Sequence, residues 1–134
     1  MKKDPIIIFV CEHGAAKSVI AAAYFNHLAG ARNLNLRAIA RGTNPESEFS
    51  AKTLEGLQRD GLMLPEGTPQ KLTRADLERT RQIISFCELP TEYQQIGVSR
   101  SVLNVERWND VPQVSENYEK ARDKIVEHLG IMMK

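Results

Sequence analysis

The stretch IIIFVCEHGAAKS, residues 6–18, contains the transition on which the architecture of the chain rests. Its first five residues form a continuous β-branched and aromatic run, which is typical of a strand buried on both faces. A turn-like segment follows, and a helix is predicted from Ser18 to about Leu28, with Gly30 as its stop. A buried strand that leads through a tight loop into a helix indicates an α/β fold.

Strand-like and helix-like segments alternate along the rest of the chain. Further strands are predicted over 36–40, 83–87 and 102–105. Strands separated by helices need crossover connections, so the sheet is expected to be parallel and covered on both faces. We therefore predict one α/β domain, residues 1–134, with three α-β-α layers around a central four-stranded parallel sheet.

The remaining helices have recognisable ends. Helices are predicted over 50–60, from Thr73, and over 115–130, where Gly130 ends the last one. The first of them is expected to begin at a Ser50 cap and to turn three apolar residues inward: Ala51, Leu54 and Leu57.

Charge and hydropathy exclude several functional classes. The formal net charge of +1 gives no field that would attract a nucleic acid. No stretch approaches the roughly 18 apolar residues of a membrane span, and the apolar run before Cys11 is too short for a secretory signal. We expect a cytoplasmic protein without a membrane or nucleic-acid partner, as a monomer or weak homodimer.

Cys11 and Cys87 are the only cysteines, which is too few for a disulfide framework. Two free thiols in a reducing compartment are the simplest interpretation. The three histidines are scattered, so neither residue type has the spacing of a zinc site. No metal is therefore expected.

The loop after the first predicted strand carries the candidate chemistry. Consecutive backbone N–H groups in such a loop, together with a helix N-terminus, can form an oxyanion site. A thiol at its mouth feels the same positive potential, which favours the nucleophilic thiolate of Cys11. Ser18 can donate a hydrogen bond to that thiolate or cap the helix. The predicted anion-binding loop comprises Glu12, His13, Gly14, Ala15, Ala16 and Lys17.

Cysteine, five residues, a basic residue and then Ser or Thr at a strand-to-helix turn is the signature of thiol phosphatases. In a short α/β chain it resembles the low-molecular-weight protein tyrosine phosphatases and the arsenate reductases of the same fold. Some of those reductases carry a Cys-x-His-Asn-Ala-Gly-Arg-Ser loop before an alanine-rich helix. Cys11, His13, Ala15 and Ser18 match that loop, and Ala21-Ala22-Ala23 fits the helix.

The resemblance implies a phosphatase-type loop in which Cys11 attacks phosphorus or arsenic, while Lys17 and Ser18 hold the oxyanion and stabilise the thiolate. It also implies a general acid near Trp108, where the family has Asp followed directly by Pro. This chain has Asn109-Asp110-Val111-Pro112, so Asp110 is the predicted acid. The implied ligands are phosphate, arsenate or a phosphorylated substrate, with no cofactor.

Two differences between this loop and that of the family matter. Lys17 stands in place of an arginine, which clamps two oxygens at once, whereas lysine offers a point charge. Loss of one bidentate contact to a transition state costs roughly 10²–10³ in rate. Gly14 stands in place of an asparagine and reaches left-handed backbone without strain, so the loop shape is expected to persist.

Cys87 is the candidate redox partner. In the reductase branch that couples to thioredoxin, a cysteine at this point attacks the first one, and a third cysteine completes the relay. This chain has no third cysteine, so arsenate reduction would need an external low-molecular-weight thiol or a redoxin.

Three interpretations of the chain stay open. The first is an enzyme that forms a cysteinyl-phosphate or a cysteinyl-arsenate. The second is a catalytically weakened oxyanion-binding or regulatory protein, because Lys17 replaces the family arginine. The third is a structural or partner-binding domain that retains only the fold.

Overall fold

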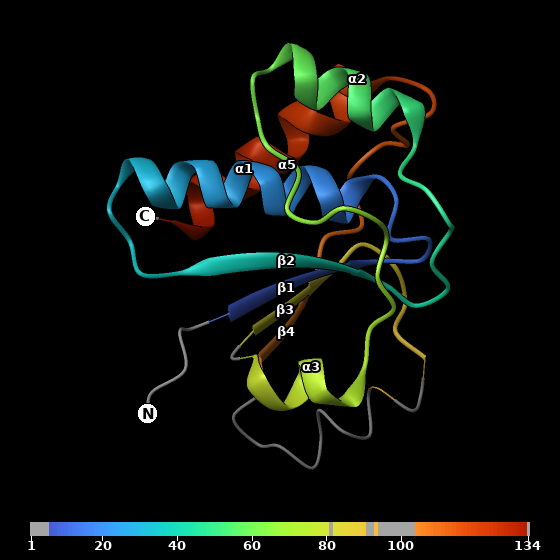
Figure 1. Ribbon diagram of the computed structural model, residues 1–134. Coiled ribbons are helices and arrows are strands. Elements are labelled where there is room, and N and C mark those ends of the chain that lie inside the picture. Colours follow the sequence, from blue (N-terminus) through green and yellow to red (C-terminus); the bar gives the residue numbers. More distant parts are fainter. Residues whose placement is uncertain (1–5, 81, 91–92, 94–103, 134) are drawn as a thin grey trace.

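A four-stranded parallel sheet forms the centre of the computed structural model, which describes residues 6–80, 82–90, 93 and 104–133. Its strands pair in the order β2-β1-β3-β4. α1, α5 and α2 lie on one side of this sheet and α3 lies on the other (Figure 1). The predicted three-layer architecture is therefore confirmed. The described elements are β1 (Ile6–Cys11), α1 (Lys17–Ala31), β2 (Arg37–Gly42), α2 (Ala51–Arg59), α3 (Arg74–Arg79), β3 (Gln82–Ser85), β4 (Asn104–Arg107) and α5 (Tyr118–Met132).

β1 is a central strand that separates two apolar clusters. Ile7 and Phe9 belong to the cluster shared with α1 and α5, whereas Ile8 and Val10 belong to the cluster on the side of α3. Such burial of both faces explains the unbroken apolar run that predicts this strand. Because β1 pairs with β2 on one side and β3 on the other, its last residue, Cys11, emerges at the middle of the carboxyl edge.

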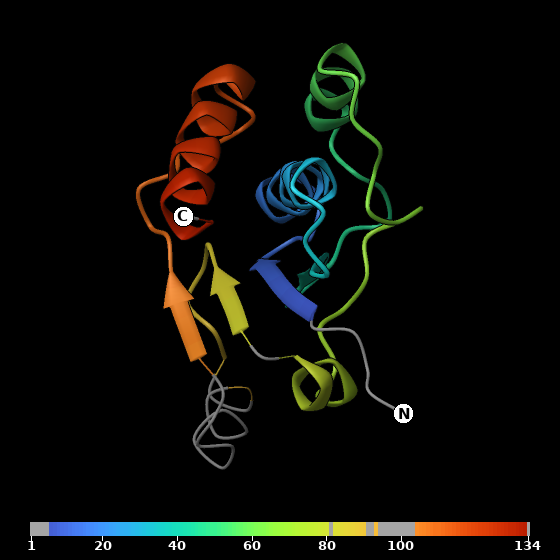
Figure 2. The ribbon, with the colours of Figure 1, turned by 90° about the vertical axis from the view of Figure 1, so that its left-hand side faces the viewer.

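α1 lies in the middle of the helix layer, with α5 and α2 on its two sides (Figure 2). This position accounts for the small alanine side chains on the helix, which are buried together with larger residues such as Phe25. The predicted stop at Gly30 is wrong by one residue, since α1 continues to Ala31. The left-handed backbone that follows a helix is taken by Asn33, with φ of 56°.

α2 begins where predicted but turns a different face inward. The Ser50 hydroxyl accepts from the Thr53 N–H at 3.1 Å, which confirms the cap. Ala51 and Leu54 are exposed, however, and the buried residues are Thr53, Gly56 and Leu57. The cause is the Tyr118 ring of α5, which lies so close to Gly56 that an added Cβ would stand 2.2 Å from it.

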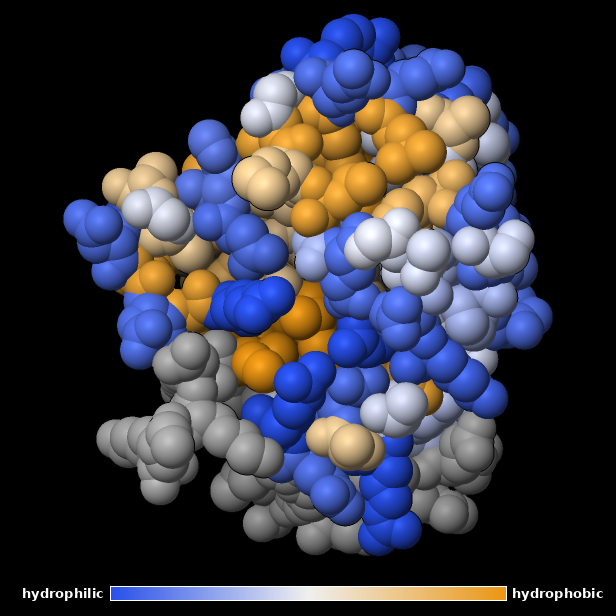
Figure 3. All heavy atoms as spheres, in the orientation of Figure 1, coloured by the Kyte–Doolittle hydropathy of each residue, from blue (hydrophilic) through white to orange (hydrophobic). Residues whose placement is uncertain are grey.

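Leu54 is exposed, with 39% of its surface accessible. Figure 3 shows apolar atoms gathered around α2. Met63 and Leu64, shortly after this helix, are also exposed, and 87% of the Met63 surface is accessible. The inward position predicted for Leu54 is thus wrong because packing against α5 rotates the helix.

The boundaries of the last elements shift by two or three residues. α5 starts at Tyr118 instead of 115, because the Asn117 side chain caps it by accepting from the Lys120 N–H at 3.0 Å. It also runs past Gly130 to Met132. β4 lies over 104–107, and the first two residues of the strand predicted at 102–105 lie outside the described residues. Among the described helices, none combines the length and apolarity needed to cross a membrane.

Asp60, the C-terminal cap of α2, connects all three helices of this layer. Its Oδ2 accepts hydrogen bonds from Tyr24 of α1 at 2.5 Å and from Tyr118 of α5 at 2.9 Å. Its Oδ1 accepts from the Arg122 Nη1 at 3.2 Å. Burial disfavours the charge, but the hydrogen bonds from the two tyrosines and Arg122 outweigh it and hold the pKa of Asp60 below its ordinary 3.8.

Asp60→Asn is expected to lower the free energy of unfolding at neutral pH by about 1–2 kcal/mol, because the tyrosines and Arg122 lose a charged acceptor. A depressed native pKa contributes stability that is present above the unfolded pKa and is lost as the pH falls through the native value. The difference between variant and wild type should therefore shrink at about pH 3. Urea unfolding, monitored by the fluorescence of Trp108, measures the difference in stability at neutral pH and at about pH 3.

Asp123→Asn is the matched control for this experiment, because Asp123 also pairs with Arg122 but its side chain is 70% exposed. The control should change stability by less than about 0.5 kcal/mol. A difference for Asp60→Asn that is equally large at both pH values would contradict this account of Asp60.

Candidate active site

Hydrogen bonds to its carbonyl groups hold the loop from Cys11 to Ala16 against a neighbouring segment. Four of these carbonyl groups accept backbone N–H groups from the segment 43–50, which follows β2. The bonds run from Thr43 to Cys11 (3.2 Å), from Asn44 to Glu12 (2.7 Å), from Glu46 to His13 (3.0 Å) and from Ser50 to Ala15 (3.0 Å). The carbonyl oxygens are thus turned toward this neighbouring segment.

The N–H groups of the same loop have no acceptor among the described parts of the protein. Within the described residues, no backbone N–H of residues 12–19 donates to another protein group. The first turn of α1 belongs to this set, and Ala16 at its start provides no side-chain cap. Unpaired N–H groups at a loop and a helix N-terminus form a region of positive potential that suits an anion.

Two glycines allow the loop to lie against β2. Gly14 has φ of 62°, which is the left-handed conformation expected from the sequence. Gly42, the last residue of β2, approaches it so closely that an added Cβ would lie 2.7 Å from the Gly14 nitrogen. Neither position has space for a side chain, so the loop and β2 share a direct backbone contact.

Cys11 and Ser18 meet beneath the loop. The Cys11 Sγ and the Ser18 Oγ are 3.0 Å apart, and both residues are buried. Ser18 lies in the first turn of α1, so its hydroxyl reaches back to the end of β1. A hydroxyl at this distance can donate to a thiolate and stabilise its charge.

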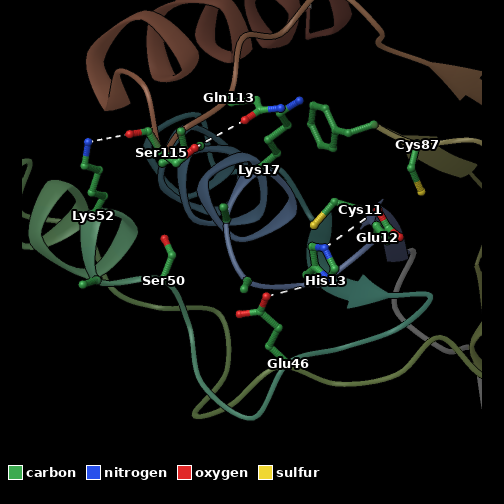
Figure 4. A pocket seen from close by; sticks show the side chains of 15 residues that line it. Cys11, Glu12, His13, Lys17, Glu46, Ser50, Lys52, Cys87, Gln113 and Ser115 are labelled. Carbon is green, nitrogen blue, oxygen red and sulfur yellow. Dashed lines mark hydrogen bonds and ion pairs between the residues drawn. The ribbon is translucent and has the colours of Figure 1, made fainter.

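A cavity of about 570 Å³ opens above Cys11. The loop forms its floor, and the remaining walls come from the start of α2, from residues just after β3 and from the segment that leads to α5 (Figure 4). Besides Cys11 and other loop residues, its lining includes Glu46, Ser50, Lys52, Phe86, Cys87 and Gln113. The cavity is large enough for an oxyanion together with the group that carries it.

The described residues that line the cavity include two lysines, Lys17 and Lys52, and one histidine, but no arginine. In Figure 4 the Lys17 side chain extends toward Gln113. Lys52 donates from Nζ to the Ser115 carbonyl oxygen at 2.6 Å. Sequence reasoning missed Lys52, because no local pattern indicates that the start of α2 lines the cavity.

His13 lies at the cavity rim between two carboxylates (Figure 4). Its Nε2 is 3.8 Å from Glu12, and its Nδ1 is 3.8 Å from Glu46. More than half of the surface of all three side chains is exposed, so these pairs are weak. Glu46 was not predicted as a site residue. A hydrogen bond from its backbone N–H to the His13 carbonyl holds it at the rim, and no local sequence pattern indicates this contact.

Asp110, the predicted acid, is not among the residues that line this cavity. Its Oδ1 lies 2.7 Å from the His128 Nε2, and its Oδ2 lies 3.4 Å from the Lys124 Nζ, so both contacts are with α5. The hydrogen bond with His128 holds the pKa of Asp110 below its ordinary value. In this arrangement Asp110 is an ionised acceptor, and its role as acid stays a prediction.

Cys87 lies on the cavity wall as a free thiol, two residues beyond the end of β3. Burial, followed by the negative charges of Cys11 and Glu12, raises its pKa, although a hydrogen bond with Ser85 opposes this shift. The two thiols therefore share one cavity without a disulfide between them. Among the described residues there is also no cluster of three or more acidic, histidine or cysteine side chains that could hold a metal ion.

The chain was compared with protein-family models and with curated proteins. The family model described as low molecular weight phosphotyrosine protein phosphatase matches residues 6–129. A search of curated proteins found no match.

Solved structures from three sources share the fold. YfkJ from Bacillus subtilis is 21% identical, with a TM-score of 0.78 over 98% of this chain and 94% of that one. An arsenate reductase from Archaeoglobus fulgidus is 22% identical, with a TM-score of 0.70 over 94% and 97%. A low molecular weight protein tyrosine phosphatase from T. tengcongensis is 18% identical, with a TM-score of 0.72 over 96% and 97%.

Gly42→Ala is expected to displace the loop, because its new Cβ would overlap the backbone of Gly14. We expect a loss of about 1–3 kcal/mol in the free energy of unfolding. Any protection of Cys11 by inorganic phosphate against alkylation should disappear as well. Iodoacetamide labelling in a Cys87→Ala background, followed by mass spectrometry, measures the protection.

The matched control is Gly67→Ala, where an added Cβ would meet no atom within 4 Å. It should leave the protection unchanged. A Gly42→Ala protein that unfolds like wild type and is still protected by phosphate would show that the Gly14–Gly42 contact does not shape the loop.

Proposed function

Because the chain belongs to the low molecular weight phosphotyrosine protein phosphatase family, we propose that it is an enzyme in which Cys11 attacks a tetrahedral oxyanion. The observation that carries this proposal is the position of the Cys11 Sγ, 3.0 Å from the Ser18 Oγ, beside a loop whose N–H groups have no protein acceptors among the described residues. The ligand is a phosphoryl group or arsenate, in agreement with the phosphatases and arsenate reductases that share this fold.

The proposed first step forms a bond between the Cys11 sulfur and phosphorus and breaks the bond between phosphorus and the leaving oxygen, which departs with the electron pair of that bond. The hydrogen bond from Ser18 stabilises the thiolate before attack. N–H groups of the loop and of the first turn of α1 receive the equatorial oxygens, whose charge increases in the transition state. Lys17 adds a formal positive charge at the same end of the helix. Water then attacks the cysteinyl-phosphate, phosphate leaves, and the thiolate is restored.

For arsenate, the same attack displaces one arsenate oxygen as water and yields a cysteinyl-arsenate. A second thiol then attacks the Cys11 sulfur and forms a disulfide with it, while the electron pair of the broken S–As bond leaves with arsenite. Cys87 lies on the cavity wall, but burial raises its pKa and favours its less reactive thiol form. With two cysteines in the chain, the proposed reduction draws on an external low-molecular-weight thiol or a redoxin.

A second candidate function is supported by Lys17. Within the described lining of the cavity there is no arginine that could replace the family clamp. A lysine still attracts an oxyanion, but it cannot form two parallel hydrogen bonds with a transition state. The alternative is therefore an oxyanion-binding or regulatory protein with little turnover.

Cys11→Ser is expected to abolish the hydrolysis of p-nitrophenyl phosphate, since the hydroxyl is a much weaker nucleophile than a thiolate. Phosphate should still bind, because the loop N–H groups remain. Cys87→Ser tests the second thiol: we expect hydrolysis and arsenate reduction by an external thiol both to persist, because the proposed reductant is external. Release of p-nitrophenol and arsenite are the two readouts. Unchanged hydrolysis by Cys11→Ser would refute the proposed nucleophile.

Lys17→Arg is expected to raise the hydrolytic kcat by about 10²-fold, because it introduces the missing bidentate clamp. Lys52→Arg is the matched control, since it makes the same chemical change at the other lysine that lines the cavity. A gain confined to Lys17→Arg supports an enzyme with an intact anion loop. If neither variant gains activity although phosphate still protects Cys11, the weakened binding protein is the better description.

A further inference from the structure

The carboxylate predicted to supply a proton is bound elsewhere in the fold. Both oxygens of Asp110 contact α5, through His128 and Lys124. The residue directly before Pro112 is Val111, which is buried with 6% of its surface accessible. Neither Asp110 nor Val111 lines the Cys11 cavity. Of the segment that leads to α5, only Gln113, Val114 and Ser115 line the cavity, and none of them carries a carboxylate.

Among the described lining residues, the carboxylates of the cavity are engaged at its rim. Glu12 and Glu46 lie on opposite ring nitrogens of His13, each at 3.8 Å, and their side chains are 65% and 58% exposed. A general acid must lie within hydrogen-bond reach of the leaving oxygen, which departs on the side opposite the attacking sulfur. Glu12 and Glu46 instead face the imidazole and the solvent.

We propose, on the basis of the function proposed above, that Cys11 accepts phosphoryl groups whose leaving group needs no proton from the protein, and that acyl phosphates are this substrate class. A carboxylate is weakly basic and departs as an anion, whereas an alkoxide or a phenolate is more basic and needs an acid. The positive charges of Lys17 and Lys52, both on the cavity wall, attract the departing carboxylate.

The chemistry is balanced without a protein acid. The Cys11 thiolate supplies the electron pair for the new S–P bond while the O–P bond breaks, and the carboxylate keeps the electron pair of the broken bond. Water then forms an O–P bond, the S–P bond breaks, the sulfur leaves as thiolate, and the protons of the water pass to phosphate and solvent. No oxidant, reductant or metal is consumed.

The second step is affected as well, because no carboxylate is positioned over Cys11 among the described residues that line the cavity. Water must attack the cysteinyl-phosphate without a general base, and such bases contribute about 10²–10⁴ in rate. The intermediate should therefore accumulate on Cys11. One acyl group should be released rapidly per active site, followed by a slow steady rate.

The test compares acetyl phosphate with phosphotyrosine in rapid mixing experiments on the full chain. We expect acetyl phosphate to phosphorylate Cys11 at least about 10²-fold faster than phosphotyrosine does. Intact-protein mass spectrometry should detect one added phosphoryl group, and Cys11→Ser, which is the control for side reactions of acetyl phosphate, should lack it. Equal rates for the two donors, or a mass without the adduct during turnover, would overturn the inference.

Two conservative variants search for a hidden acid. Asp110→Asn and Glu46→Gln should leave the ratio of the acetyl phosphate and phosphotyrosine rates unchanged. A variant that slows phosphotyrosine by more than about tenfold relative to acetyl phosphate would identify that carboxylate as the acid and refute the inference. Circular dichroism and urea unfolding establish that each variant is folded.

Failure of the proposed function has a different signature. If no donor modifies Cys11, and phosphate does not protect it from alkylation, then both the enzyme and the acyl phosphate class are refuted. If Cys11 is phosphorylated by both donors at similar rates, the nucleophile stands and only the substrate class is refuted.

Discussion

The close contact between the backbones of Gly14 and Gly42 is the constraint on which the site depends. It brings the loop after β1 against the segment after β2, and the four bonds from that segment then turn the loop carbonyls away from the cavity. The carbonyl groups of the loop thus have hydrogen-bond partners within the protein, whereas its N–H groups remain available to an anion. An oxyanion site is thus a consequence of how two adjacent parallel strands end.

The parts of the molecule that local sequence patterns predict are those governed by near neighbours along the chain. The apolar run of β1, the glycine turn after Cys11 and the Ser50 cap each act within a few residues, and the structure confirms all three. The hydrogen bond between Cys11 and Ser18 also lies within this short range, because one loop joins the strand to the helix. The parallel order of the sheet follows from the alternation of strands and helices.

Features that depend on distant residues were predicted poorly. The inner face of α2 is set by the Tyr118 ring, which lies far away in the sequence, so the periodicity of α2 alone indicated the wrong residues. Asp110 contacts His128 and Lys124 of α5, and no pattern around Asp110 reveals these partners. Lys52 and Glu46 line the cavity because the segment 43–52 lies beside the loop in space, although it is distant from the loop in sequence. Local patterns therefore did not indicate them.

Hydrogen bonds connect one end of α2 to the segment just before α5 and the other end to α5 itself. Near the first residue of α2, Lys52 donates to the Ser115 carbonyl, and at its C-terminal cap Asp60 accepts from Tyr118 and Arg122. The two walls of the cavity that these segments provide are therefore preorganised. An incoming ligand would lose little affinity to the ordering of its surroundings, and selectivity among ligands would rest on the fit to a rim of fixed width.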